Sequence, residues 1–364
     1  MSKDIVAATA SYEGWLSAHV RIVSKDLALK HEHMAQDPFL FLRATYYRWA
    51  DVFPDLCPKL NAAPKVLAVG DLHSENFGTW RDGEGRLVWG VNDFDEVWTL
   101  PYTHDLVRLA TSLRLAADHK NFNLSADDAC ALVLSGYRDA VERRRRAFVL
   151  EERHPHLREL ADINLSNAAD FWAKLTFHSE AEDIPEEAKT LLLEALPDGA
   201  RHPRFYARVA GQGSLGRPRW VVVADLHDAL IAREIKAAAP SACAWATNAD
   251  GVPPLYENIL EAATRCPDPY YHLKAGRWVV RRLAPACSRI NMSTVHCSHD
   301  RRKLMTSMGA ETANVHFGGG DLEAVQADLA ERSDKWLTKA AIKMEEKVRA
   351  DWKAWKKAFV KAKA

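Results

Sequence analysis

Two carboxylates and one carboxamide flank a short predicted hairpin in the first third of the chain. Asp71 and Asn76 precede the hairpin in the sequence GDLHSEN, and Asp93 follows it in VNDFD. The hairpin is predicted because residues 77–81 and 86–92 resemble strands and enclose the turn-forming residues Asp-Gly-Glu-Gly. Since a hairpin returns its two ends to the same place, we expect these three polar side chains to converge.

Such an oxygen-rich set suits Mg²⁺, which keeps several waters and takes substrate phosphates as further ligands. Zinc prefers histidine nitrogen and cysteine sulfur, although His73 and His104 keep a zinc or iron site open as an alternative. A second alternative is structural, because Asp and Asn often cap turns at the ends of strands.

A glycine-rich segment follows much later in the chain. Gly211, Gly213, Ser214 and Gly216 belong to GQGSLG, which lies between the predicted strands FYARVA and RWVVVAD. A dinucleotide-binding turn would need a helix after the glycines, and a strand follows instead. Lys236 lies in the next predicted strand, so a phosphate-covering loop with a nearby lysine and a simple hairpin with a surface lysine are both open.

The first cluster resembles the catalytic loop and metal-binding Asp of protein-kinase-like phosphotransferases, especially the aminoglycoside and choline kinases with their GDxHxxN loop. The resemblance implies ATP and Mg²⁺ as cofactors. It implies Asp71 as the catalytic base for an acceptor hydroxyl, and Asn76 and Asp93 as the metal ligands. Asp95 and Asp105 resemble the acidic positions that follow in small-molecule kinases, with a purely structural role as the alternative.

The same resemblance gives the glycine segment a role. In kinases a strand, a glycine loop and a second strand cover the phosphates, and a lysine in the third strand pairs with them. Lys236 would be that lysine. Glu257, on the predicted helix 254–266, would be its ion-pair partner, with Glu261 as the competitor.

The order of these segments is reversed relative to ordinary kinases, because Asp71 precedes the glycine loop by 140 residues. We therefore expect an α+β, bilobal, protein-kinase-like fold in circularly permuted order, with a helical lobe and a small antiparallel sheet lobe. Residues 1–200 would form the helical part with the catalytic and metal-binding loops. Residues 201–285 would form the sheet part, and residues 286–364 would return to the helical lobe.

Most of the chain, from about residue 30 to 320, resembles an uncharacterised bacterial family of the protein-kinase-like superfamily. The shared segments are PFLFLRATYYRW, GDLHSENFG, NDFDE, DLVRLATSL, GQGSLG and IKAAAPS. Ala44 departs from this pattern, because the family tends to have glycine there. The apolar periodicity predicts helices over 12–32, 38–53, much of 105–196 and from 303 onward.

Composition excludes several classes. Lys plus Arg and Asp plus Glu both number 49 in 364 residues, which argues against a globally basic nucleic-acid binder. No apolar run approaches the length of a membrane span, the start does not resemble a signal peptide, and six scattered cysteines fit a reducing, cytoplasmic setting. Residues 333–364 form a basic amphipathic helix that either packs on the domain or contacts an anionic membrane surface.

The sequence thus favours an ATP- and Mg²⁺-dependent phosphotransferase acting on a small-molecule hydroxyl, with a nucleotide and an unidentified acceptor as its partners. Three alternatives stay open. One is a non-catalytic nucleotide-binding pseudokinase, and another is nucleotidyl transfer on the same fold. The third is a metal-dependent hydrolase that uses Asp71, His73, Asp93 and His104.

Overall fold

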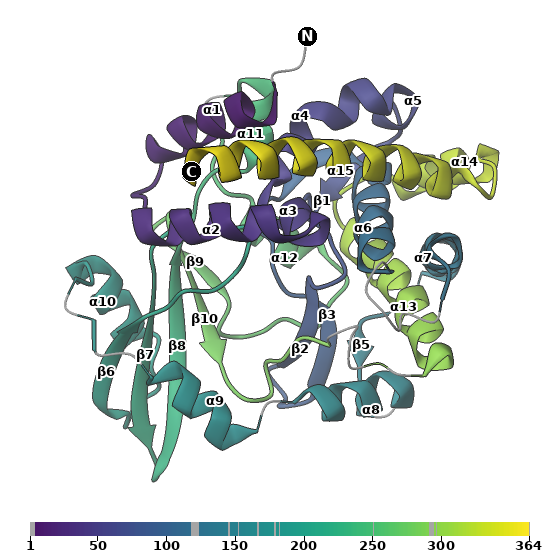
Figure 1. Ribbon diagram of the computed structural model, residues 1–364. Coiled ribbons are helices and arrows are strands. Elements are labelled where there is room, and N and C mark those ends of the chain that lie inside the picture. The colour runs from purple at the N-terminus through teal and green to yellow at the C-terminus, as the bar shows by residue number, and fades with distance from the viewer. Residues whose placement is uncertain are drawn as a thin grey trace.

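The computed structural model describes most of the chain, namely residues 4–117, 124–144, 146–151, 153–165, 167–177, 180, 181, 183–249, 251–290, 295 and 297–363. Helices and small antiparallel sheets share this part of the chain, so the expected α+β class is confirmed (Figure 1). Within the described residues, no helix has the length and apolar character that a bilayer crossing requires.

Five helices open the fold in the upper half of Figure 1: α1 (Ile5–Ser17), α2 (Ser24–Gln36), α3 (Pro38–Ala44), α4 (Tyr46–Leu56) and α5 (Pro58–Asn61). Others form the helical body and its connections: α6 (Tyr102–Ala117), α7 (Ala126–Arg143), α8 (Pro155–Asn164), α13 (Ser298–His316), α14 (Leu322–Glu331) and α15 (Trp336–Lys363). Helices α7 and α13 pack along each other, and α15 lies across α2 and α6. A large apolar core joins these elements.

The predicted helix over 12–32 is wrong at its centre, because α1 ends at Ser17 and α2 begins at Ser24. The backbone N–H of Val23 donates to the carbonyl of Gly216 at 2.8 Å, so this amide serves the glycine loop and not a helix. The break therefore has a tertiary cause that the local pattern does not contain.

A five-stranded antiparallel sheet lies at the lower left of Figure 1, in the order β6-β7-β8-β10-β9. Its strands are β6 (Arg201–Ala207), β7 (Arg219–Leu226), β8 (Ala229–Ala237), β9 (His272–Lys274) and β10 (Trp278–Leu283). The apolar pattern of the segments FYARVA, RWVVVAD, LIAREIKA and RWVVRRL predicts four of them, and the short β9 is missed. It also missed α11 (Ala242–Thr247), and it made α12 (Tyr256–Ala262) too long at both ends.

The two faces of this sheet differ because successive side chains point to opposite sides. Trp220 and Ile235 belong to the apolar face that packs against α10 (Glu186–Glu194). On the other face Val221 and Val223 lie under α9 (Ala168–Leu175), and the register then places charged residues of β8 beyond them. That charged end of the face turns toward the helical body.

The predicted hairpin is confirmed: β2 (Phe77–Arg81) pairs with β3 (Leu87–Val91), and β5 (Phe148–Val149) extends this small sheet. Asp82 closes the turn, since its carboxylate accepts from the backbone N–H groups of Glu84 and Arg86. A separate pair, β1 (Lys65–Ala68) and β4 (Trp98–Pro101), brackets the hairpin in the sequence.

The basic C-terminal helix α15 buries its apolar stripe. Leu337, Ala341 and Met344 are at most 1 % exposed, and Trp355 is 7 % exposed. The sequence left open whether this helix packs on the domain or contacts a membrane surface, and in the structure its apolar stripe packs on the domain.

Candidate active site

A buried polar network holds the loop between β1 and β2 in place. The carboxylate of Asp105, on α6, accepts from the backbone N–H groups of Val69 at 2.7 Å and Gly70 at 2.9 Å. His316 Nε2, on α13, lies 3.1 Å from the same carboxylate. Gly70 has a φ of +80°, and a Cβ there would collide with the carbonyl oxygen of Glu96. Only glycine fits this position, so the loop has one defined path.

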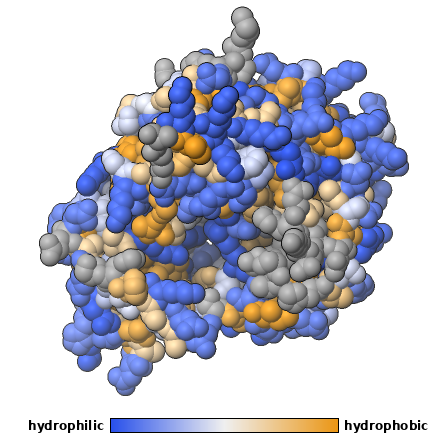
Figure 2. Space-filling view, in the orientation of Figure 1, coloured by the Kyte–Doolittle hydropathy of each residue, from blue (hydrophilic) through white to orange (hydrophobic). Residues whose placement is uncertain are grey.

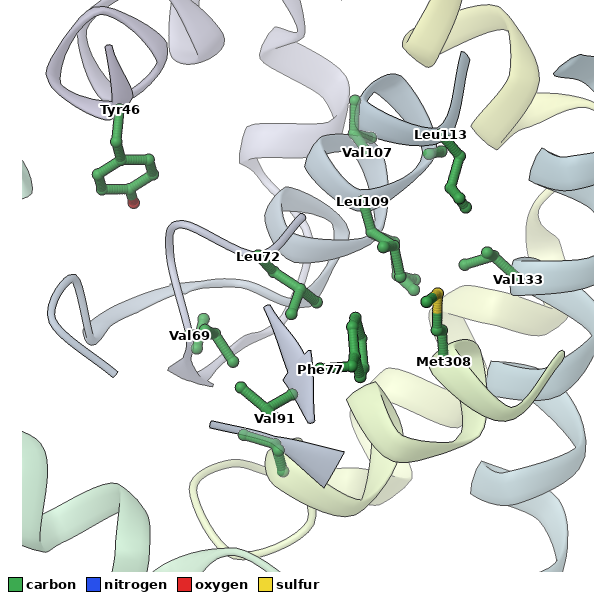
Figure 3. Packing of buried hydrophobic residues seen from close by; sticks show 14 of the residues in the cluster. Tyr46, Val69, Leu72, Phe77, Val91, Val107, Leu109, Leu113, Val133 and Met308 are labelled. Carbon is green, nitrogen blue, oxygen red and sulfur yellow. The ribbon is translucent and has the colours of Figure 1, made fainter. Parts of the chain in front are cut away.

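Apolar side chains anchor the same loop from the other side. Figure 3 shows Val69, Leu72 and Phe77 turned into the core, toward Leu109 of α6 and Met308 of α13. All five are buried, at 1 % exposure or less. The intervening polar residues of the loop are thereby left to face the cleft.

The three polar residues flanking the hairpin converge as the sequence predicts. The side-chain amide of Asn76 donates to the carbonyl of Asp71 at 3.2 Å and to the carbonyl of Asp93 at 3.1 Å. Its Oδ1 is buried and has no hydrogen-bond partner among the described residues. A buried amide oxygen without a donor is costly, so this atom is available to a ligand such as a cation.

Asp71 is held by Arg108 of α6. The guanidinium contacts Asp71 Oδ1 through Nε at 2.8 Å and through Nη2, and it lies 4.9 Å from the ring centre of Tyr46 and 5.0 Å from that of Trp49. Burial raises the pKa of Asp71, and Arg108 opposes that rise. The arrangement fixes one carboxylate oxygen and leaves the other, Oδ2, toward the glycine loop.

Lys236 of β8 reaches across the cleft to the acidic loop. Its Nζ lies 2.5 Å from Asp95 Oδ1, 3.4 Å from Asp93 Oδ1 and 3.3 Å from the hydroxyl of Tyr256. Burial alone would raise the pKa of Asp93, but Lys236 and nearby arginines hold it well below its usual range. Asp93 is therefore an anion at neutral pH.

The structure does not bring Glu257 or Glu261 to this lysine. Both glutamates lie on exposed positions of α12, whereas Tyr256 of the same helix faces Lys236. The sequence pattern places an acid near the lysine correctly, but the acid comes from the segment after β3. The prediction that Glu257 pairs with Lys236 is therefore wrong. The carboxylate close to the lysine is that of Asp95.

The glycine loop lies directly over Asp71. Gly211 and Gly216 have φ values of +80° and +96°. A Cβ on Gly213 would lie 3.4 Å from Asp71 Oδ2, so the backbone of the loop lies within van der Waals reach of the carboxylate. The hydroxyl of Ser214 accepts from Arg219 Nη2 at 2.8 Å. The predicted loop and the predicted catalytic residue thus share one site.

Helix α2 holds the glycine loop in place, a role that the sequence analysis does not identify. Lys30 Nζ donates to the carbonyl of Gly213 at 2.9 Å, and His33 Nδ1 lies 2.8 Å from the side-chain oxygen of Gln212. Burial lowers the pKa of Lys30 to about 8. No local signal in α2 identifies these contacts, because their partners lie some 180 residues away.

Arg108 and Glu96 were also missed, although each has a visible signal. Arg108 is a charged residue inside the apolar helical run DLVRLATSL, and it is fully buried. Glu96 ends NDFDE and accepts from the backbone N–H of Ala242 at 2.6 Å. Burial raises the pKa of Glu96 to about 7, and Arg217 opposes that rise. An ionisable residue among buried neighbours is the pattern to look for.

The histidines of the hydrolase alternative are separated. His73 borders the small cavity beside Asp71 and Asp93, and burial holds its pKa well below its usual range. His104 is instead packed among aromatic rings, 4.9 Å from that of Phe53, and is 2 % exposed. Across the described residues, no group of three or more His, Cys, Asp and Glu side chains is placed to hold a metal.

Two cavities meet at this site. A small one, of about 30 Å³, lies between the acidic loop and the glycine loop, and its lining includes Asp71, Asn76 and Asp93. A larger one, of about 420 Å³, lies between the five-stranded sheet and the β2–β3 hairpin. Both are bordered by Gly211 and Arg289, so they adjoin. In Figure 2 the surface is hollowed between these two sheets.

Comparison with known proteins gives one relationship. No curated protein matches the chain, and no solved structure matches it. The model of a family described as "Uncharacterized protein conserved in bacteria (DUF2252)" matches residues 21–184 and 176–358, which together span most of the chain and every site residue named above. The protein therefore belongs to this bacterial family, DUF2252.

Proposed function

We propose that the protein is an ATP- and Mg²⁺-dependent phosphotransferase that acts on the hydroxyl of a small molecule. One observation carries this proposal: Asp71, Asn76 and Asp93 converge beneath a glycine loop and beside a buried lysine. Catalysis of phosphoryl transfer rests mainly on positioning and charge neutralisation, and these are the groups it needs.

In this proposal Asn76, through its Oδ1, and Asp93, through its carboxylate, would hold Mg²⁺. Two protein ligands suffice, because Mg²⁺ takes its other ligands from water and nucleotide phosphates. The unpartnered amide oxygen of Asn76 and the anionic state of Asp93 support this assignment. Lys236 orients the phosphates as a point charge.

Asp71 accepts or orients the proton of the acceptor hydroxyl. Its Oδ1 is held by Arg108, while Oδ2 faces the glycine loop under which the transferred phosphoryl group would lie. The nucleoside would extend from the small cavity into the larger one, because both share Gly211.

The proposal includes a kinase-like, circularly permuted architecture. Strands β6 and β7 enclose the glycine loop, β8 has the lysine, and α11 and α12 follow before β9 and β10. The helices α13 and α15 return to α6 and α7. This layout supports a sheet lobe inserted into a helical lobe, with the cleft between them as the nucleotide site.

Thermal unfolding with ATP and Mg²⁺, separately and together, tests the proposal. Saturation at a hundred times Kd stabilises by roughly 2.7 kcal/mol, so the two together should raise Tm by several degrees. Asp93→Ala should remove the Mg²⁺-dependent part of the shift and reduce ATP turnover by about a thousandfold or more. Asp334→Ala, at a side chain that is 91 % exposed, is the matched control.

The mass of the product separates the remaining alternatives. A gain of one phosphoryl group on an acceptor supports the proposal, whereas a gain of a nucleotidyl group replaces it with nucleotidyl transfer. Binding of MgATP without turnover against a broad panel of hydroxyl acceptors would leave a nucleotide-binding protein. Turnover that survives in Asp93→Ala would remove the assigned site.

A further inference from the structure

The larger cavity has an unusual charge for a site of its size. Six arginines border it: Arg208, Arg219, Arg265, Arg281, Arg282 and Arg289. The bordering residues include one carboxylate, Asp268, which lies 3.7 Å from Arg282. Since arginine keeps its charge in proteins, the walls are strongly positive.

A second carboxylate lies behind the wall and neutralises only part of this charge. Glu234 of β8 contacts Arg208, and lies 3.1 Å from Arg219 and 2.7 Å from Arg281. Burial would raise the pKa of Glu234, but these arginines hold it well below its usual range, so it is an anion. With Asp268, and with Glu311 beside Arg265, at most three negative charges face six positive ones, so a formal surplus of at least three remains.

Two of the six arginines, Arg265 and Arg289, have no carboxylate oxygen within ion-pair distance in the described part of the chain, although the more distant Glu311 attracts Arg265. Arg265 lies 4.5 Å from the ring centre of Trp80 and 4.9 Å from that of Phe94, and its Nη1 donates to the carbonyl of Val91. Its Nε is buried and has no hydrogen-bond partner among the residues that the structure describes. Burial lowers the pKa of Arg289 to about 10, with repulsion from Arg43 as the next cause.

Gathering like charges in a protein cleft costs free energy, which an anionic ligand would recover. Guanidinium groups match phosphate and carboxylate oxygens in geometry as well as charge. The cavity also presents the rings of Phe171 and Tyr271, and its volume fits an organic ligand of moderate size.

We propose that this arginine cavity binds a phosphate or carboxylate group that is additional to the triphosphate of the nucleotide. The group belongs either to the nucleoside half of the nucleotide or to an acidic acceptor beside it. Binding of this anionic group requires only the arginine cavity, whereas the ligand's role as a substrate rests on the proposed function.

Isothermal titration in the presence of EDTA tests the inference, because without divalent metal the small cavity lacks the cation that would hold nucleotide phosphates there. Adenosine 3′,5′-bisphosphate and fructose 1,6-bisphosphate represent the two sources, with adenosine 5′-monophosphate as the reference. At least one bisphosphate should bind about tenfold more tightly than the monophosphate, and its affinity should fall with added salt. A preference for the nucleotide or the sugar bisphosphate assigns the source. Equal, weak binding of all three overturns the inference.

Two variants locate the binding. Arg208→Gln leaves Glu234 with two arginine partners, so the fold should persist, and Arg289→Gln changes a residue at the junction of the two cavities. Each should weaken bisphosphate binding several-fold. Arg302→Gln, on an exposed position of α13, should not. Unchanged affinity in both cavity variants, with melting curves that show folded protein, would place the anion elsewhere.

Asp93→Ala separates this inference from the proposed function. The variant should lose turnover while keeping metal-free bisphosphate binding, because Asp93 is a negative group beside the cavity. Bisphosphate binding without any phosphoryl transfer by wild type would refute the enzyme and keep the anion site. Phosphoryl transfer by wild type with no preference for a second anionic group would support the enzyme and refute the anion site.

Discussion

The two adjoining cavities of the cleft differ in how far their charges are balanced. In the small cavity each of the central carboxylates has a protein cation close by: Arg108 for Asp71, and Lys236 for Asp93 and Asp95. In the arginine cavity the cations outnumber the carboxylates. The small cavity is thus almost neutral and tightly packed, whereas the arginine cavity keeps a charge that the protein does not neutralise. The difference indicates that the small cavity suits the precise positioning of reacting groups, whereas the arginine cavity suits the binding of an anion.

The largest effect is expected from Lys236→Met, which removes the cation shared by Asp93 and Asp95. Breaking a buried pair leaves uncompensated charge, so the free energy of unfolding should fall by about 3 kcal/mol. Turnover should fall by about a thousandfold. Urea unfolding and a turnover assay measure the two effects. Lys274→Met, an exposed lysine of β9, is the control, and a Lys236→Met protein with normal stability and turnover would contradict the described balance of the small cavity.

Arg108→Gln should move the pH dependence of turnover. Asp71 acts as an anion in the proposed reaction, so activity is lost as pH falls through its pKa. Burial has raised that pKa and Arg108 opposes the rise, so removal of the guanidinium raises it further. The acid limb of kcat/KM should move to higher pH by about one unit. Arg114→Gln, whose partners are Asp127 and Glu345, should leave the limb in place.

Lys30→Met tests whether α2 holds the glycine loop in place. This loop lies at both cavities, because Gly211 borders each of them. Loss of the bond from Lys30 to the carbonyl of Gly213 should cost about 1 kcal/mol locally. Amide hydrogen exchange in residues 211–216 should become several-fold faster. Lys25→Met, an exposed lysine of the same helix, is the comparison. Equal exchange in both variants would show that α2 does not hold the loop.

The smallest effect concerns Glu311, which lies behind β3 and close to Arg265. Burial raises its pKa to about 7, against the opposing charge of Arg265. A raised pKa means that its contribution to stability is present below the usual glutamate range and is lost as pH rises through 7. Glu311→Gln, which mimics the protonated form, should therefore reduce the fall in Tm between pH 5.5 and 8 by a few degrees. An unchanged pH profile would mean that Glu311 is already ionised and lowers the surplus charge of the arginine cavity.

Much of the cleft follows from local sequence patterns. The hairpin between β2 and β3 fixes the convergence of Asp71, Asn76 and Asp93, because its turn residues and strand lengths define where its ends meet. The position of the glycine segment between β6 and β7 could also be predicted, since the apolar pattern around it changes from a helical to a strand-like period. These features depend on neighbours within about twenty residues.

The parts that could not be predicted depend on distant partners. The partner of Lys236 is Asp95, and its identity depends on how the sheet sits against the helical body. The break between α1 and α2 depends on a hydrogen bond from Val23 to Gly216. The arginine cavity collects side chains from β2, β7, β10 and the segments around them, and no single stretch of sequence shows that they share one space.

The hydrogen bond between Asp105 and His316 has a consequence for how the protein is made. It joins residues 211 positions apart, and the contacts from Lys30 to Gly213 and from Asp93 to Lys236 join residues 183 and 143 positions apart. Such closures come late because their entropy cost is paid before their contacts form. A nascent chain that has not yet reached α13 already contains Asp71, Asn76, Asp93 and Lys236, but lacks the histidine beneath the loop that presents them. Synthesis of α13 is therefore the step at which the ribosome-bound chain can first complete its cleft.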